Sequence, residues 1–267
     1  MIQPLISIIT VVYNASPTLE TTLRNVLSQR KDLFEYWVID GGSTDGSIEI
    51  IKKYEHQLEG WISEPDKGIF DAMNKGVDKA KGEWLFFLGA DDLLYPGVLD
   101  KVAHYLQSNL SVVYGDVLLD NGATFRSHIG TRCLFENKLH HQGAFYNRRL
   151  FDGFRYNQKF KNAADYELTL RIYMQKQPFL YIPHKISIFA SGGNSSDSGV
   201  GVKVGIEDTN NIRKLYLKNS FMNFFFSTLL KVYYPYMHKR GKIIASLRKV
   251  LKVERDKPSL QDIYKSA

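Results

Sequence analysis

Short apolar runs alternate with amphipathic, helix-like segments through the first half of the chain. Residues 5–13 form an almost unbroken apolar run, which is typical of a β-strand buried on both faces. Ser16 then provides a helix N-cap and Pro17 a first helical position, and apolar residues recur at helical spacing as far as Val26. This repeated strand-helix step predicts an α/β fold with a mostly parallel central sheet covered by helices on both faces.

The same alternation predicts the later elements. Strands are expected at residues 36–39, 61–63, 84–88 and 112–114, and helices at residues 48–51, 69–80, 98–106 and 166–175. Between about residues 121 and 191 the pattern is less regular. A Ser- and Gly-rich stretch at residues 191–196 predicts a loop, which is either a plain surface loop or a lid over a bound ligand.

Positive charge is concentrated at the end of the chain. Residues 1–202 hold 21 Lys and Arg against 23 Asp and Glu, whereas residues 203–267 hold 14 against 5, so the net charge of +7 comes from the tail.

The single cysteine, Cys133, excludes a disulfide framework and a multi-thiolate zinc site. The sequence has no apolar run near the roughly 20 residues that a membrane-spanning helix needs, and the first apolar stretch reads as a strand and not as a signal peptide.

The basic tail is also rich in aromatic residues. Between residues 243 and 251 apolar side chains recur at helical spacing opposite basic ones, a pattern typical of a helix that lies on an anionic membrane surface. Alternatively, the aromatic residues cover the core or form a contact between copies in a homo-oligomer. Nucleic-acid binding is not expected, because no recognised nucleic-acid-binding module accompanies the basic patch.

Carboxylates follow three of the expected strands: Asp40, Asp66 and the adjacent pair Asp91 and Asp92. Because the carboxyl ends of parallel strands meet at one edge of a sheet, these side chains should converge. Adjacent carboxylates repel each other unless a cation neutralises them, and Mg²⁺ or Mn²⁺ with substrate phosphates would do so. Alternatively, Asp91 or Asp92 caps the following helix. Neither a G-x-G-x-x-G nor a P-loop motif is present.

Four segments, at residues 8–14, 38–46, 64–76 and 89–92, resemble in order and spacing the family 2 glycosyltransferases, which have the GT-A fold with its Rossmann-like sheet. The resemblance covers roughly residues 5–195, and the subgroup that the chain most resembles builds bacterial surface polysaccharides. It implies an inverting, metal-dependent transfer of a hexosyl group from a nucleotide-sugar to an acceptor hydroxyl.

The resemblance also implies a set of donor-site residues. The nucleotide pocket would be lined by Thr10, Val12, Tyr13, Asn14 and Asp40, and Asp66 and Asn74 would lie close to the base, ribose or phosphates. Asp92 would be the direct ligand of Mn²⁺ or Mg²⁺, and Asp91 would lie nearer the ribose or donor sugar.

One position departs from the family pattern. Many members carry a second acidic residue directly after the position of Asp40, where it contacts the base, and this chain has Gly41 there. The donor could therefore be a UDP-, GDP- or dTDP-sugar.

The second half of the resemblance concerns the acceptor. Asp165, in the segment at residues 162–168, matches the aspartate that deprotonates the acceptor hydroxyl, and Glu167 is the alternative base. Asp165 could instead be a helix N-cap. His141 would either reach the diphosphate or metal, or be a hydrogen-bonded structural residue.

We therefore expect a GT-A domain at residues 1–202, with a nucleotide-sugar half to about residue 118 and an acceptor half from about residue 119, followed by a basic amphipathic tail at residues 203–267. The expected role is synthesis of capsule, O-antigen or exopolysaccharide on a glycan or polyprenyl-linked acceptor, by a cytoplasmic protein peripheral to the inner face of the membrane. Two other readings are a non-catalytic nucleotide-sugar-binding or membrane scaffold protein, and a glycoside hydrolase, which would need neither nucleotide nor metal.

Overall fold

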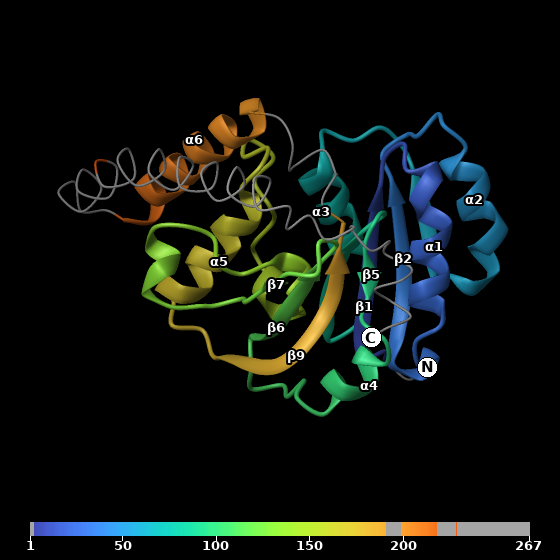
Figure 1. Ribbon diagram of the computed structural model, residues 1–267, viewed down its shortest axis with the longest axis horizontal. Helices are drawn as coiled ribbons and strands as arrows, with labels where there is room; N and C mark the ends of the chain where they lie inside the picture. Colours follow the sequence, from blue (N-terminus) through green and yellow to red (C-terminus); the bar gives the residue numbers. More distant parts are fainter. Residues whose placement is uncertain (1–2, 191–198, 218–227, 229–267) are drawn as a thin grey trace, which may run out of the picture.

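A computed structural model describes residues 3–190, 199–217 and 228 of the chain (Figure 1). Its centre is a nine-stranded sheet with strand order β3-β2-β1-β4-β8-β6-β9-β5, and β7 pairs with β6. The strands are β1 (Ile6–Val12), β2 (Phe34–Asp40), β3 (Gly60–Ser63), β4 (Trp84–Gly89), β5 (Leu93–Leu94), β6 (Val112–Leu119), β7 (Thr124–Phe125), β8 (Ala144–Asn147) and β9 (Phe179–Phe189).

The strands β3, β2, β1 and β4 are parallel, as the alternating pattern predicts. The second half of the sheet was not predicted in this form, because β8 is antiparallel to both β4 and β6, while β9 is parallel to β6 and antiparallel to β5. The α/β class with a mostly parallel sheet is confirmed. Each antiparallel pair contains β7, β8 or β9, which lie in the region where the sequence pattern is least regular.

Six α-helices and five short 3₁₀ helices are described. The α-helices are α1 (Ser16–Leu27), α2 (Ser47–Tyr54), α3 (Ile69–Lys79), α4 (Val98–Ala103), α5 (Ala164–Met174) and α6 (Gly199–Tyr216). The 3₁₀ helices are η1 (Lys31–Leu33), η2 (Glu55–Gln57), η3 (Thr131–Leu134), η4 (His141–Gly143) and η5 (Arg148–Phe151). Helix α4 ends three residues before the predicted end at residue 106.

The helices cover both faces of the sheet, because neighbouring residues on a strand point to opposite sides. Ile8 on β1 packs into a core shared with α1, α2 and α4, and Ile9 packs into a second core shared with α3, α5 and α6. In Figure 1, α1 and α2 lie on one side of the parallel strands and α3, α5 and α6 on the other.

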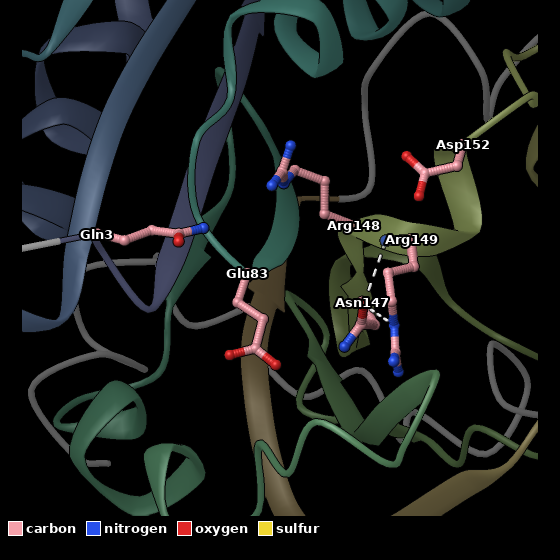
Figure 2. Close-up of a pocket in the computed structure, with 6 residues that line it drawn as sticks. All are labelled: Gln3, Glu83, Asn147, Arg148, Arg149 and Asp152. Carbon is pink, nitrogen blue, oxygen red and sulfur yellow. Dashed lines mark hydrogen bonds between the residues drawn. The ribbon is translucent and has the colours of Figure 1, made fainter.

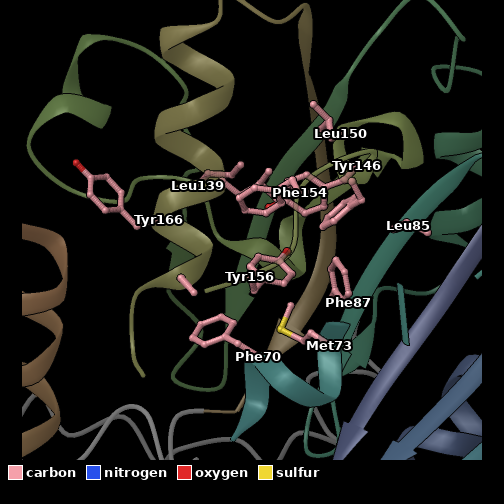
Figure 3. Packing of buried hydrophobic residues seen from close by; sticks show 14 of the residues in the cluster. Phe70, Met73, Leu85, Phe87, Leu139, Tyr146, Leu150, Phe154, Tyr156 and Tyr166 are labelled. Carbon is pink, nitrogen blue, oxygen red and sulfur yellow. The ribbon is translucent and has the colours of Figure 1, made fainter. Parts of the chain in front are cut away.

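Aromatic side chains join α3 to the acceptor half of the chain. The ring of Tyr156 lies 5.5 Å from that of Phe70 on α3 and 5.8 Å from that of Phe87 on β4, measured between centroids (Figure 3). Burial of this cluster fixes α5 beside the parallel strands, because each large ring removes much apolar surface from water.

Helix α6 runs across residue 202, the predicted boundary between domain and tail. Its residues Ile212 and Arg213 are buried, and Ile212 belongs to the core that contains α5. The first part of the predicted tail therefore packs on the domain.

The amphipathic segment at residues 243–251 and the predicted loop at residues 191–196 lie outside the described residues. Among the helices that the structure describes, none is both long and apolar enough to cross a membrane.

Candidate active site

The predicted carboxylates meet at the carboxyl edge of the parallel strands. Val12 at the end of β1 pairs with Asp40 at the end of β2, and Val11 pairs with Gly89 at the end of β4. The start of β8 lies at the same edge because β8 is antiparallel to β4, and the end of β9 lies there because β9 runs in the direction of β4. Residues from both halves of the chain therefore surround one edge.

Asp40 organises the turn after β2. Its carboxylate accepts hydrogen bonds from the backbone N–H groups of Gly42 and Ser43, each at 3.0 Å, and from the hydroxyls of Ser43 at 2.5 Å and Ser63 at 2.7 Å. Asp40 is only 1% exposed. The carboxylate therefore shapes the predicted nucleotide pocket from inside and has no surface for direct contact with a ligand.

The segment after β1 contributes accessible groups. Tyr13 is 61% exposed. Asn14 has a left-handed backbone with φ of 49°, its N–H donates to Ser43 Oγ at 2.8 Å, and its Oδ1 accepts from Thr44 N at 2.9 Å. By contrast, Thr10 and Val12 are buried, and the Thr10 hydroxyl pairs with the Tyr36 hydroxyl at 2.9 Å. Of this predicted set, the structure places Tyr13 and Asn14 at the surface.

Asp66 occupies the space that a side chain at position 41 would need. A Cβ atom on Gly41 would lie 2.9 Å from Asp66 Cγ and closer still to Asp66 Oδ2. The other carboxylate oxygen, Oδ1, accepts from the backbone N–H of Gly68 at 2.8 Å. The missing acidic residue at position 41 is therefore matched by a carboxylate that reaches the same place from the loop after β3.

Asn74 has a structural partner. Its Nδ2 donates to the carbonyl oxygen of Tyr156 and its Oδ1 accepts from the N–H of Tyr156, both at 2.9 Å. The side chain is buried in this pair of bonds. Asn74 thus lies away from the accessible surface of the predicted pocket and ties α3 to the acceptor half.

Asp91 and Asp92 converge over Gly89. A Cβ atom on Gly89 would meet Asp92 Oδ2, would lie 2.9 Å from Asp91 Oδ1 and would lie 3.1 Å from Gln142 Nε2, so only glycine leaves room for them. Asp92 is 1% exposed, whereas Asp91 is half-buried. Burial raises the pKa of both carboxyls, and the charge of Asp91 raises the pKa of Asp92 further.

The Asp92 carboxylate is already enclosed by donors. Its Oδ1 accepts from the N–H of Ala190, at the end of β9, at 2.8 Å, and its Oδ2 accepts from Gln142 Nε2. Among the described residues no Lys or Arg forms an ion pair with either carboxylate. A pair of oxygen ligands without a cationic partner fits a hard divalent ion, and burial leaves Asp91 as the more accessible ligand.

Asp165 lies in the first turn of α5, close to His141 on η4. Its Oδ2 accepts from Asn137 Nδ2 at 2.7 Å and lies 3.8 Å from His141 Nδ1. Burial raises the pKa of the Asp165 carboxyl, and the nearby His141 and the Asn137 bond oppose that rise. Burial lowers the pKa of His141, and the neighbouring Asp165 opposes that fall.

The 3₁₀ helix η4 connects these groups. His141 faces Asp165, and the next residue, Gln142, donates to Asp92. Gln142 is in turn held by the hydroxyl of Ser187 on β9, which donates to its carbonyl oxygen at 2.6 Å. The structure therefore brings Asp91, Asp92, His141 and Asp165 together through one short segment. Gln142 and Asn137 had no predicted role, although Gln142 lies beside the predicted His141.

Glu167, the alternative base, points elsewhere. It accepts from the hydroxyl of Tyr216 on α6 at 3.2 Å. Because two residues along an α-helix are about 200° apart, Asp165 and Glu167 face nearly opposite sides of α5.

Two surface cavities lie away from this site, at the opposite edge of the sheet. The first, of about 120 Å³, is lined by Gln3, Glu83, Asn147, Arg148, Arg149 and Asp152 (Figure 2). The second, of about 320 Å³, shares Arg149 with it. Arg149 Nε donates to Asn147 at 3.0 Å and its Nη2 donates to the Ser108 carbonyl, so its guanidinium is engaged in holding the chain. None of the predicted site residues lines either cavity.

No three His, Cys, Asp or Glu side chains form a metal-ligand cluster within the described part of the chain. A catalytic Mg²⁺ is usually held by one or two carboxylates together with substrate phosphates.

A parallel sheet with this carboxylate edge is the architecture of GT-A glycosyltransferases. The model of the Glycosyl transferase family 2 matches residues 7–177, and the chain belongs to that family. It is a glycosyltransferase.

Individual relatives agree with this assignment. A PGL/p-HBAD biosynthesis glycosyltransferase of Mycobacterium bovis is 36% identical over 183 residues, which is 65% of this chain and 71% of the relative. An uncharacterized glycosyltransferase of Haemophilus influenzae is 36% identical over 120 residues, which is 43% of this chain and 48% of the relative.

Solved structures show the same fold. S. aureus TarS 1-349 in complex with UDP has a TM-score of 0.61 at 18% identity, over 78% of this chain and 64% of TarS 1-349, so the chain spans less than two thirds of that structure. The mannosyltransferase PcManGT from Pyrobaculum calidifontis, in complex with GDP-Man and Mn²⁺, has a TM-score of 0.59 at 16% identity, over 95% of this chain and 89% of PcManGT.

Proposed function

We propose that this chain is an inverting hexosyltransferase that moves a sugar from a nucleoside-diphosphate donor to an acceptor hydroxyl. The observation that carries the proposal is the link through η4, in which His141 faces Asp165 and Gln142 donates to Asp92. A candidate base and a candidate cation site are thus contacted by neighbouring residues of one short turn. That arrangement suits a sugar held between a leaving diphosphate and an attacking hydroxyl.

Asp165 is the proposed catalytic base. A carboxylate that takes the proton of the attacking hydroxyl as the glycosidic bond forms lowers the barrier to transfer. Burial raises the pKa of Asp165, which makes it a stronger base than an exposed aspartate. A base on the side of the sugar opposite the leaving group would produce inversion at the anomeric carbon.

The turn that contains Asp91 and Asp92 is the proposed site of Mn²⁺ or Mg²⁺. The bound ion would stabilise the charge that develops on the departing nucleoside diphosphate. The family pattern assigns the direct contact to Asp92. The burial of Asp92 and its two donors favour Asp91 as the ligand, with Asp92 orienting the turn.

The proposed donor is a UDP- or dTDP-sugar. Asp66 Oδ1 is held by the N–H of Gly68, while Oδ2 lies against Gly41. One remaining oxygen suits the single N3–H donor of uracil or thymine, whereas the adjacent N1–H and N2–H groups of guanine suit a carboxylate with both oxygens available. TarS binds UDP and UDP-GlcNAc, and PcManGT binds GDP-Man. The chain therefore follows the TarS pattern in this proposal.

The proposed product is a glycan of the bacterial cell surface, with the sugar transferred to a glycan or polyprenyl-linked saccharide. The PGL/p-HBAD biosynthesis relative supports a role in envelope glycan synthesis. A lipid-linked acceptor would bring the protein to the inner face of the membrane, where the basic tail could bind anionic lipid. We also propose that residues 1–202 together with the packed part of α6 form the catalytic domain.

Asp165→Asn tests the proposal. The variant should lose transfer by at least about a hundredfold, a typical share for general base catalysis, while thermal stabilisation by UDP-glucose, UDP-GlcNAc, dTDP-rhamnose or GDP-mannose with Mn²⁺ stays as in the wild type. Asp91→Asn should instead lose the Mn²⁺-dependent part of that stabilisation. Turnover by Asp165→Asn at the wild-type rate would remove Asp165 as the base, and release of product without a nucleotide donor would indicate hydrolysis.

A further inference from the structure

A loop between β7 and β8, at residues 130–138, connects the C-terminal helix to the candidate base. Helix α6 contributes Arg213, which is 2% exposed and donates from Nη1 to the carbonyl oxygen of Phe135 at 3.1 Å. Two residues later, Asn137 donates from Nδ2 to Asp165 Oδ2 at 2.7 Å. A buried arginine far along the chain thus holds the segment that touches Asp165.

The loop is also fixed from α5. The hydroxyl of Tyr166, the residue after Asp165, donates to the carbonyl oxygen of Cys133 at 2.7 Å. Asn137 is stabilised within the loop because its Oδ1 accepts from Leu139 N at 3.2 Å. The amide of Asn137 is therefore oriented from both sides, with its oxygen in a turn and its nitrogen directed at Asp165.

We propose that Asn137 is a positioning residue for Asp165, and that α6 sets its place through the bond from Arg213 to the backbone of the loop at residues 130–138. The inference depends on the proposed role of Asp165 as the base. A carboxylate that must accept a proton from a substrate needs a fixed orientation, and a charge-assisted hydrogen bond from a restrained amide supplies one. Helix α6 is then part of the catalytic apparatus and not only a connection to the tail.

Several groups act on the protonation of Asp165. Besides the bond from Asn137, the backbone N–H groups of Tyr166 and of Asp165 itself favour the charged carboxylate and lower its pKa. His141 on η4 lies 3.8 Å from Oδ2, beyond hydrogen-bond distance, and the hydroxyls of Tyr146 on β8 and Tyr156 before α5 interact with the carboxylate through its charge. Asn137 provides the close side-chain hydrogen bond in this set. Loss of that bond would disfavour the charged carboxylate, so the proton of Asp165 would leave at a higher pH.

The test uses Asn137→Ala in the full chain, with Asn121→Ala as a matched control. Both asparagines accept a backbone N–H two residues later, Leu139 N at 3.2 Å and Ala123 N at 2.9 Å, and alanine removes that bond at both positions. Only at position 137 does the substitution also remove a donor to Asp165, and it introduces no new charge. The readouts are the ¹³C NMR titration of the Asp165 side-chain carboxyl, assigned with Asp165→Asn, and the pH profile of UDP or dTDP release from whichever UDP- or dTDP-sugar stabilises the wild type.

Asn137→Ala should raise the titration midpoint of Asp165 by about one pH unit and lower UDP or dTDP release at pH 7 by about 10- to 100-fold, the range for a lost hydrogen bond to a charged group. The KM for the donor should stay within about twofold, and Asn121→Ala should match the wild type. A wild-type midpoint and rate in Asn137→Ala would overturn the inference.

Arg213→Gln tests the α6 part, with Lys214→Gln on the exposed side of the same helix as its control. Arg213→Gln should shift the Asp165 midpoint in the same direction, Arg213→Lys should restore most of the wild-type behaviour, and Lys214→Gln should change neither readout. If Arg213 acts through Asn137, the double variant of Arg213→Gln and Asn137→Ala should show no larger rate loss than Asn137→Ala alone. Additive rate losses in the double variant would overturn the inference that α6 acts on Asp165 through Asn137. Wild-type turnover by Asp165→Asn would instead mean that the proposed role of Asp165 as the base has failed.

Discussion

At the scale of single residues, the site depends on where side chains are missing as much as on where they are present. Gly41 leaves the space that Asp66 fills, and Gly89 leaves the space over which Asp91, Asp92 and Gln142 converge. In each case a Cβ atom would overlap a carboxylate. In this chain, Gly41 and Gly89 therefore leave the room that the neighbouring carboxylates occupy.

Gly41→Ala should weaken donor binding because the added methyl group displaces the Asp66 carboxylate. We expect the Kd for UDP with Mn²⁺ to rise by about tenfold, the effect of one lost charge-assisted hydrogen bond, as measured by isothermal titration calorimetry. On an Asp66→Ala background the same substitution should have no further effect, since the clash is gone. Equal weakening in both backgrounds would contradict the steric explanation.

At the scale of elements, α3 is joined to the acceptor half by a small number of specific contacts. The two hydrogen bonds from Asn74 hold the backbone of Tyr156, whose ring packs on Phe70 and Phe87. The segment that follows leads into α5 and so to Asp165. Asn74 therefore contributes to the site by fixing the relation between its two halves.

Asn74→Ala should lower the free energy of unfolding by about 2–3 kcal/mol, because a buried N–H and a buried carbonyl of Tyr156 both lose their partner. Urea denaturation measures this effect. Asn157→Ala is the control, since Asn157 makes a single local bond, to Lys159 N at 3.1 Å, in the same segment, and it should cost well under half as much. Similar losses in the two variants would show that the paired bonds have no special weight.

At the scale of the whole molecule, the core extends beyond the predicted domain boundary. Ile212 is fully buried and Arg213 is nearly so, and both belong to the predicted tail. Residues 218–267 carry 11 Lys and Arg against 3 Asp and Glu. In the proposal that the tail binds a membrane surface, the candidate segment is therefore shorter than residues 203–267, and residues 218–267 carry most of the positive charge of the tail.

A chain that ends at Leu217 should retain cooperative thermal unfolding, whereas one that ends at Val202 should not, because only the second loses Ile212 and Arg213 from the core.

The full chain should sediment with vesicles of phosphatidylglycerol and phosphatidylcholine at low salt and be released at 0.5 M NaCl, where the Debye length falls to roughly 4 Å. The chain ending at Leu217 should stay in solution. Binding by that shorter chain would place the membrane contact on the domain.

The sequence by itself determined the parallel half of the sheet and the carboxylates at its edge. Those features depend on local apolar periodicity and on residues that follow a strand directly, such as Asp40 and Asp92. The tertiary structure decided which carboxylates face outward, since burial and hydrogen bonding come from residues distant in the chain. Gln142 reaches Asp92 across 50 residues, and Asn137 reaches Asp165 across 28. Such pairings depend on how β8, β9 and α6 pack, and packing is a property of the whole fold that no local pattern encodes.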